Sequence, residues 1–369
     1  MAQATASVFC MGDQLELMID DLRYLVEAES PSNDRQLLAQ SAETVADLME
    51  RRLGSRPNLI EGGSGPHVHW SGGGTPKVLI LGHHDTVFPA GTLAQRPFAV
   101  ADGRATGPGV FDMKGGIVQA IHAVASLQDA SGVEILLSCD EEIGSLTSRA
   151  MLEERAMACG AVLVLEPSGD GGALKTGRKG TGTFEVVIGG RAAHAGLEPH
   201  RGVNSLVEAA YQVLAITKFA DDEQGTTVTP TVAHSGTADN VVPAETRVRV
   251  DVRVTSAEEA HRIETAFAAL EPVHPEATIV VNGRVGRPPM PESASAELMP
   301  LAVAHDSSIQ GVAVGGGSDG NFTAACGVPT LDGLGAVGGG AHADHEFIEV
   351  ATMPARAELL AAIIEARMS

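Results

Sequence analysis

The 369-residue sequence contains few basic side chains, few aromatic side chains and no long apolar run. Its 25 Lys and Arg residues are outnumbered by 47 Asp and Glu residues, which gives a formal net charge of −22. Such a chain repels phosphate backbones and anionic lipid headgroups, so we expect neither nucleic acid nor a membrane surface as a partner. The sequence also lacks a stretch of 18 apolar residues, which argues against a transmembrane helix.

Cysteine is also scarce, and its spacing excludes two common uses. The four cysteines lie far apart without a Cys-x-x-Cys pair; they are Cys10, Cys139, Cys159 and Cys326. We therefore expect neither a disulfide framework nor a thiolate zinc site, but four small buried residues. Residues 1–12 contain no Lys or Arg, and their longest apolar run is too short for a secretory signal. We expect a cytoplasmic protein, provided that no export signal has been removed.

Apolar residues are plentiful, at 44% of the chain, and the length suggests about two domains. Short runs rich in Val, Ile and Leu predict strands buried on both faces. These runs are residues 78–81, 135–137, 162–165 and, more weakly, 328–331. Helical periodicity is found over residues 15–28, 35–53 and 117–127, with Ser32 and Asn33 as candidate caps. The alternation of strands and helices predicts an α/β domain with a mainly parallel sheet.

The middle of the chain, from about residue 177 to 286, alternates apolar with polar residues. The clearest example is Arg247 to Val254, a period-2 pattern that predicts a strand with one buried face. Strand, helix, strand, strand, helix and strand are expected at 184–188, 203–216, 226–234, 246–254, 258–270 and 277–284. This β-α-β-β-α-β order is typical of a ferredoxin-like α+β domain. We therefore expect an inserted domain at 178–286 within a discontinuous domain of residues 1–177 and 287–369.

Carboxylates and imidazoles follow the predicted strands of the outer domain. They occur in Gly82-His83-His84-Asp85, Asp140-Glu141-Glu142, Glu166-Pro167, the loop Gly107–Asp112 and Gly338–His345. Each motif alone has a plain structural explanation as a polar loop, a helix cap or a strand terminus. In open α/β sheets, however, ligands bind at the carboxyl ends of the strands. Because the converging charges would repel one another without cations, their convergence favours a metal site.

The ligand types indicate which metals fit. Oxygen and nitrogen donors without a thiolate suit zinc, with cobalt or manganese as alternatives. Two metal sites fit better than one: two imidazoles with Asp112, Glu142 and Glu166 give each metal an imidazole and a carboxylate, and Asp112 bridges both metals.

The residues beside these ligands suggest roles in catalysis. Alternate residues of a strand share a face, so His83 and Asp85 are expected to point together, while His84 points away. Asp85 would then orient the His83 ring. Glu141 is left beside a ligand, where a general base that deprotonates a metal-bound water would lie.

Taken together, these motifs resemble those of the dinuclear zinc exopeptidase family that includes glutamate carboxypeptidase, aminoacylase, acetylornithine deacetylase, succinyl-diaminopimelate desuccinylase and peptidase T. The motifs that carry the resemblance are Gly82–Phe88, Gly107–Gly116, Asp140–Ser145, Glu166-Pro167 and His342–Asp344. They occur in the family's order over nearly the whole chain. The family's architecture, a catalytic domain interrupted by a lid and dimerisation domain, also matches the expected division.

The resemblance implies a role for each matching residue. The metal ligands would be His83, Asp112, Glu142, Glu166 and His342, with two Zn²⁺ per chain, or Co²⁺ or Mn²⁺ in their place. Glu141 would be the general base, and Asp85 would orient His83. In Gly189–Gly196, which resembles the lid motif, His194 would stabilise the oxyanion, typically in the active site of the partner subunit. A homodimer formed through the inserted domain is therefore implied.

Further matches concern the substrate. Asn240 and Arg287 match substrate-binding positions, and Arg287 is the candidate for gripping the substrate's α-carboxylate, with a structural salt bridge as the alternative. Residues 175–180 and 315–321 resemble the glutamate carboxypeptidase branch more than the deacetylases.

These features lead to one preferred function and two alternatives. We expect a carboxypeptidase-type hydrolase that cleaves a C-terminal amino acid, with glutamate as the candidate, from a peptide or N-acyl amino acid. Glu141 would activate a water that bridges the metals. An aminoacylase would use the same machinery on another acyl group. A non-catalytic metal-bound binding protein is a remote alternative, because Glu141 is intact.

Overall fold

The computed structural model describes residues 11–369, which form two compact units. The first contains residues 11–177, 292–313 and 318–369, and the second contains residues 178–291 and 314–317. The sequence placed the boundaries at residues 178 and 287. The chain re-enters the first unit only at Glu292. Strand β12 (Thr278–Arg287) ends at the expected boundary, but the residues after it stay with the second unit, where Met290 forms a β-bridge with Arg178.

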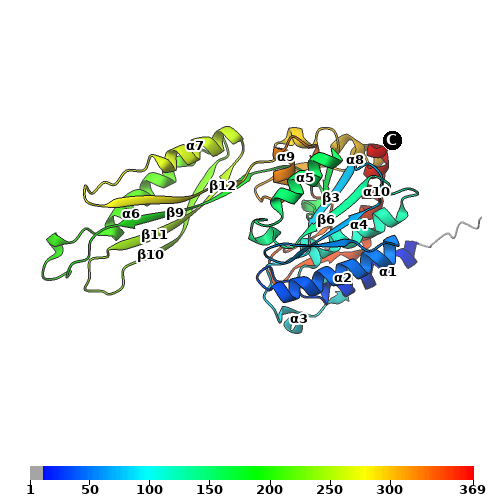
Figure 1. Cartoon of the computed structure of the whole chain (residues 1–369), viewed down its shortest axis with the longest axis horizontal. Coiled ribbons are helices and arrows are strands. Elements are labelled where there is room, and N and C mark those ends of the chain that lie inside the picture. The colour runs from blue at the N-terminus through cyan, green and yellow to red at the C-terminus, as the bar shows by residue number, and fades with distance from the viewer. Residues whose placement is uncertain (1–10) are drawn as a thin grey trace, which may run out of the picture. The chain divides into compact units, whose positions relative to one another are not determined.

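A six-stranded sheet forms the centre of the first unit, with the order β1-β2-β6-β3-β7-β14 (Figure 1). Its strands are β1 (Asn58–Glu61), β2 (Pro66–Ser71), β3 (Val78–His83), β6 (Val133–Ser138), β7 (Val162–Val164) and β14 (Thr330–Leu331). The four strands β6, β3, β7 and β14 are mutually parallel, while β1 and β2 are antiparallel additions at one edge. The predicted mainly parallel sheet is confirmed.

The continuous apolar runs of these strands are explained by burial on both faces. Val78 and Ile80 of β3 pack into one core cluster with helices α1, α2, α4 and α10, whereas Leu79 and Leu81 pack against α5 on the other face. The helices are α1 (Met11–Val26), α2 (Arg35–Leu53), α3 (Thr92–Gln95), α4 (Gly115–Ser126), α5 (Arg149–Cys159), α8 (Met299–His305), α9 (Gly320–Ala325) and α10 (Met353–Met368).

Two smaller groups of strands remain. One belongs to the first unit, and the other contains the residues at which the chain passes between the two units. The order β15-β16-β5-β4 describes a four-stranded sheet, and β8 pairs with β13. These strands are β4 (Ala99–Ala101), β5 (Arg104–Thr106), β8 (Leu174–Arg178), β13 (Gly311–Val314), β15 (Gly338–Gly339) and β16 (Phe347–Glu349). These strands were not expected from the sequence, because most are too short to show a clear period.

The second unit is an antiparallel sheet with the order β10-β11-β9-β12, covered on one face by two helices. Its elements are β9 (Gly180–Gly189), α6 (Ser205–Ile216), β10 (Thr227–Ser235), β11 (Glu245–Val254), α7 (Ala257–Ala268) and β12 (Thr278–Arg287). Val248, Val250, Val252 and Val254 of β11 all face the helices, as the alternating pattern predicts. The ferredoxin-like α+β fold is thus confirmed.

Some local expectations need correction. Helix α2 is capped by Asp34, whose carboxylate accepts the N–H groups of Gln36 and Leu37, and not by Ser32 or Asn33. Ser32 instead bonds to a buried carboxylate of the site described below.

Three further expectations concern the cysteines, the N-terminal segment and membrane-spanning helices, and the structure bears on them within residues 11–369. Cys139 and Cys159 are buried, Cys326 is only half-buried, and Cys10 lies outside the described residues, as does most of the segment used to exclude a secretory signal. Within residues 11–369, every helix is too short or too polar to cross a membrane. The cytoplasmic location stays a prediction.

Candidate metal centre

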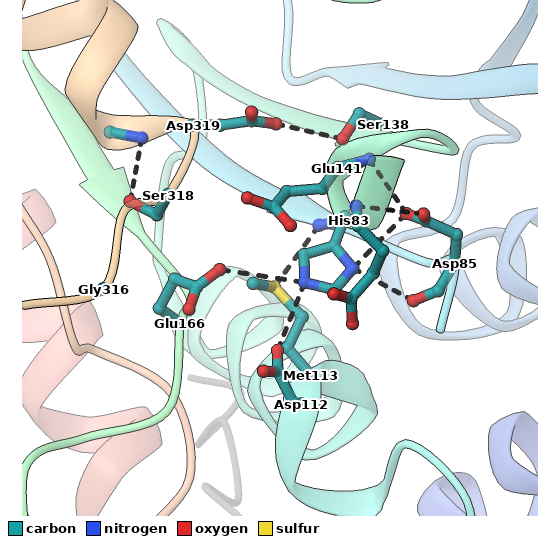
Figure 2. A network of polar contacts seen from close by, with 12 residues as sticks. His83, Asp85, Asp112, Met113, Ser138, Glu141, Glu166, Gly316, Ser318 and Asp319 are labelled. Carbon is teal, nitrogen blue, oxygen red and sulfur yellow. Dashed lines mark hydrogen bonds and ion pairs between the residues drawn. The ribbon is translucent and has the colours of Figure 1, made fainter. Parts of the chain in front are cut away.

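Loops after three parallel strands bring an imidazole and several carboxylates to one edge of the six-stranded sheet. His83 ends β3, Glu141 and Glu142 follow β6, and Glu166 follows β7. One ligand atom each from His83, Glu141 and Glu166 lies within 4.8 Å of the others, and all three residues are buried. Figure 2 shows the carboxylates of Asp112 and Glu166 directed at the His83 ring.

Asp112 lies between two imidazoles. Its Oδ1 is 3.2 Å from Nε2 of His83, and its Oδ2 is 3.3 Å from Nε2 of His342. Glu166 Oε1 is 3.7 Å from the same nitrogen of His83, and Glu142 Oε2 is 3.2 Å from that of His342. The structure therefore brings all five expected ligands together in two sets. Each set holds one imidazole and one glutamate, and the sets share Asp112.

These donors fit bound metal ions. Oε1 of Glu142 is buried and has no hydrogen-bond partner among the described residues. His83, Asp112 and Glu142 each offer a ligand atom within 4.8 Å of one another. A buried unsatisfied carboxylate oxygen is costly unless a cation or donor reaches it. Imidazole and carboxylate donors without a thiolate suit zinc and related divalent metals.

The charges of the centre perturb one another. Burial disfavours the imidazolium of His83, but hydrogen bonds to Asp112 and Asp85 outweigh it and raise its pKa well above the usual value. Hydrogen bonds to Asp112 and Glu142 raise the pKa of His342 to about 10. Burial raises the pKa of Glu142. Burial also opposes ionisation of Asp112, yet its contacts with both imidazoles lower its pKa. Clustered perturbations of this kind are typical of functional sites.

Asp85 connects His83 to the segment that carries the candidate base. It is fully buried, and its Oδ1 lies 3.4 Å from Nδ1 of His83 and accepts the Glu141 N–H at 3.3 Å. Its Oδ2 accepts the Glu142 N–H at 3.3 Å and the Ser32 hydroxyl at 2.7 Å. Asp85 therefore contacts the His83 ring, as expected from the sequence, and also holds the backbone of Glu141 and Glu142.

His84, the next residue along the chain from His83, points elsewhere. Its ring nitrogens face the Ser41 hydroxyl at 3.2 Å and the Pro66 carbonyl at 3.0 Å. Burial lowers the pKa of His84 to about 4, so it is a neutral buried residue near pH 7.

Glu346, which the sequence analysis did not single out, fastens the loop that carries Asp112. Its buried carboxylate accepts the backbone N–H groups of Gly109, Phe111 and Asp112, each at 2.9 Å. Burial raises the pKa of Glu346 to about 7. Because Glu346 follows His342 by only four residues, it connects the loops of two expected ligands. Its only signal in the sequence was this proximity to His342.

Asp319 is a second residue whose position the sequence did not reveal. It is buried, its Oδ2 accepts the Ser138 hydroxyl at 3.1 Å, and its Oδ1 accepts the Ser145 hydroxyl. These serines flank the segment that carries Glu141 and Glu142 in the chain, and Figure 2 shows the contact between Asp319 and Ser138. Residues 315–321, which include Asp319, resemble the glutamate carboxypeptidase branch, but this resemblance gave no sign of the contact.

We expect Asp319→Asn to lower kcat by about 10- to 100-fold, since residues that orient a metal centre from outside its ligand set typically have effects of this size. The acid limb of the pH–rate profile should also shift, because the Glu141 segment loses a charged anchor. Steady-state kinetics across pH measure both effects. Asp129→Asn, the same change at an exposed carboxylate that also accepts from a serine, is the control. An unchanged profile in the folded variant would contradict this role.

The second unit places its three candidate residues at two ends of its sheet. The backbones of His194 and Val241 form a β-bridge, and the N–H of Ala195 donates to the Asn240 carbonyl, so His194 and Asn240 are neighbours. His194 follows the end of β9 at Gly189, and Asn240 precedes the start of β11 at Glu245, which pairs with Gly189. Arg287 pairs with Thr181, which precedes Gly189 by eight residues of β9 and so lies roughly 26 Å from it. Within one chain, the structure therefore does not bring Arg287 together with His194.

A further buried group, formed by His67, Cys139 and Asp140, also has ligand atoms within 4.8 Å of one another. Its donors are already engaged. His67 Nδ1 accepts the Cys139 N–H at 3.2 Å, and Asp140 accepts both from Thr147 and from the Ser148 hydroxyl. This cluster is explained by hydrogen bonding alone.

The chain is similar to known proteins in both sequence and fold. Residues 79–366 match peptidase family M20/M25/M40. The chain is 33% identical to carboxypeptidase G2 of Pseudomonas sp. (strain RS-16), covering 95% of this chain and 89% of that protein. It is 28% identical to a succinyl-diaminopimelate desuccinylase of Xanthomonas oryzae pv. oryzae, covering 96% and 99%. The crystal structure of the aminopeptidase PepT from Bacillus cereus has a similar fold, with a TM-score of 0.75, 21% identity and coverage of 96% and 99%.

Proposed function

Because this chain belongs to peptidase family M20/M25/M40 and is a metallohydrolase of that family, we propose that it is a carboxypeptidase-type exopeptidase. Its substrate would be a peptide or N-acyl amino acid, from which it releases a C-terminal residue, with glutamate as the first candidate. The observation that carries the proposal is the shared Asp112 between two imidazole–glutamate sets, with Glu141 beside one of them. The similarity to carboxypeptidase G2 supports the choice of bond.

The residues present fit two divalent metals, and we propose Zn²⁺, with Co²⁺ or Mn²⁺ as substitutes. His83, Asp112 and Glu166 would hold one ion, and His342, Asp112 and Glu142 the other. Bound metals of this kind supply Lewis acidity and lower the pKa of a coordinated water.

Glu141 is the proton carrier in this proposal. One of its carboxylate oxygens lies within 4.8 Å of a ligand atom of His83 and of Glu166, and its backbone N–H donates to Asp85. A carboxylate in this position takes the proton of the attacking water and returns it to the leaving amine. Asp85 orients His83 through Nδ1, which lies 3.0 Å from the Asp85 backbone carbonyl and 3.4 Å from its Oδ1, leaving Nε2 directed at Asp112.

His194 is suited to donate to an oxyanion. Its Nδ1 accepts the N–H groups of Gly196 and Leu197, each at 3.1 Å, so the neutral ring carries its proton on Nε2. The side chain is exposed, which leaves that N–H available to a substrate oxygen.

His194 and Asn240 are proposed to serve the active site of a second copy. The chain leaves and re-enters the second unit near the bridge between Arg178 and Met290, at the Arg287 end of the sheet. His194 and Asn240 lie at the other end. Because the two groups lie at opposite ends of one sheet, we assign Arg287 to the substrate carboxylate in one active site, and His194 with Asn240 to the active site of a second copy.

A homodimer through the second unit is part of this proposal. Helix α6 exposes an apolar stripe, with Leu206, Val207, Tyr211 and Leu214 each at least 51% exposed. The same helix packs on β10, an edge strand whose outer side is unpaired within the described sheet. An exposed apolar stripe beside an open strand edge is suited to a second copy of the same surface.

Leu214→Lys should weaken this dimer by about 10- to 100-fold, because it places a charge in the apolar stripe. Light scattering over a concentration series measures the dissociation constant. Met157→Lys changes a similarly exposed apolar residue in the first unit and should leave the constant unchanged. A wild-type monomer at all concentrations would contradict the dimer.

The function is tested by a hydrolysis screen of folate-like compounds, dipeptides and N-acyl amino acids, with zinc, cobalt and manganese supplied in turn. We expect turnover of substrates that end in glutamate. Preferential turnover of N-acyl amino acids regardless of the terminal residue would favour the aminoacylase alternative instead. Metal binding without turnover of any substrate would favour a binding protein.

A further inference from the structure

A pocket of about 470 Å³ in the first unit adjoins the metal centre, and the roles assigned above do not use it. Glu142, one of the expected ligands, forms part of its wall. The other walls come from residues 31–34, which precede α2, from residues 86, 87, 89 and 90, which follow β3, and from Ile143. Ligand pockets typically measure about 300–1,000 Å³, so this space suits one substituent of a substrate held at the metals.

Apolar side chains make up half of the residues that line this pocket: Pro31, Val87, Pro89, Ala90 and Ile143. Val87 is 43% exposed and Ile143 is 38% exposed, so both present apolar surface to whatever enters. Covering such surface with an apolar group is favourable, at about 25 cal/mol per Å² removed from water.

Two of the polar side chains in the walls, Ser32 and Asp34, are already engaged. The Ser32 hydroxyl donates to Asp85, and the Asp34 carboxylate accepts the N–H groups of Gln36 and Leu37. The positive end of helix α2 is therefore occupied by its own cap and does not provide an anion site.

The pocket also lacks a positive partner for an anion. The described residues that line it include no Lys or Arg, whereas Asp34 and Glu142 are acidic. Arg35, the adjacent basic residue, bonds instead to Glu61 and to the carbonyls of residues 62 and 63. A substrate carboxylate placed here would meet like charges and no compensating cation.

The α-carboxylate of a released amino acid is therefore not expected in this pocket. The acyl group, on the other side of the scissile amide, is the part of the substrate that fits it. We propose that residues 31–34, residues 86, 87, 89 and 90, and Ile143 form the acyl-side subsite and that it selects an uncharged, apolar acyl group over an anionic one. This proposal rests on the hydrolase function proposed above, and it goes further by naming the acyl class that the enzyme accepts.

The experiment compares N-benzoyl-L-glutamate with N-succinyl-L-glutamate, which differ in the charge of the acyl group, on the metal-loaded full-length enzyme. We expect kcat/KM to favour the benzoyl compound by at least about 100-fold. Val87→Lys should reduce this ratio by about 10-fold or more, because it supplies the missing cation. Val100→Lys, at a site 41% exposed and outside the pocket, is the matched control and should preserve the ratio.

The possible results distinguish a failure of the hydrolase function from a failure of the acyl-side subsite. If the wild-type enzyme hydrolyses neither compound, nor any member of the broader screen, the hydrolase function and the subsite both fail. If both compounds are hydrolysed with equal kcat/KM, or if Val87→Lys melts like wild type yet keeps the wild-type ratio, the subsite is wrong and the function stands. If Val87→Lys does not fold, Ala90→Lys in the same wall replaces it under the same criteria.

Discussion

Glu141→Gln should bind the same amount of metal as the wild type and lose about 10²- to 10⁴-fold in kcat, the usual contribution of a general base. The amide keeps the size and the backbone contacts of the glutamate, including the hydrogen bond from its N–H to Asp85. It cannot accept the proton of the attacking water. Metal analysis of the purified variant and steady-state kinetics on a substrate from the screen measure the two properties separately.

The control for this variant is Glu154→Gln, the same change at an exposed glutamate of α5. Its kinetics and metal content should match those of the wild type. Wild-type turnover in Glu141→Gln would remove Glu141 from the mechanism. Loss of one metal in that variant would instead make Glu141 a ligand, which its closeness to His83 and Glu166 makes a meaningful outcome.

Asp112→Asn should have the second largest effect, because one carboxylate faces both imidazoles. Its Oδ1 lies nearest His83 and its Oδ2 nearest His342. An amide replaces one of these oxygens with a donor that a metal does not bind, and it removes the shared negative charge. We expect less than one tightly bound metal per chain and a loss of at least about 10²-fold in kcat/KM.

Variants that change only one of the two imidazole–glutamate sets provide the comparison with Asp112→Asn. Glu166→Gln changes a residue whose carboxylate contacts His83, and Glu142→Gln changes one whose carboxylate contacts His342. Each should release one metal and retain the other, as measured by metal analysis after dialysis. If Asp112→Asn also releases one metal only, Asp112 is not shared.

Much of the fold could be predicted from short-range patterns. The period-2 alternation of Arg247 to Val254 reflects a strand with one face against helices, and the continuous run Val78 to Leu81 reflects a strand buried on both faces. Helix α2 begins and ends where its periodicity does, at Arg35 and Leu53. Its cap was assigned wrongly because Ser32, Asn33 and Asp34 are all good cap residues, and only the backbone geometry distinguishes them.

The sequence by itself determined which chemistry is available, because strand ends in a parallel sheet meet at one edge and their ligand types can be read in order. It also determined the family, through motifs spread over the whole chain. The tertiary structure alone decided which oxygen of Asp112 faces which imidazole, and that Glu346 and Asp319 hold the loops of the centre. It also separated Arg287 from His194. The physical reason is distance along the chain: these contacts join residues far apart in sequence, and no local pattern encodes which buried carboxylate reaches which distant donor.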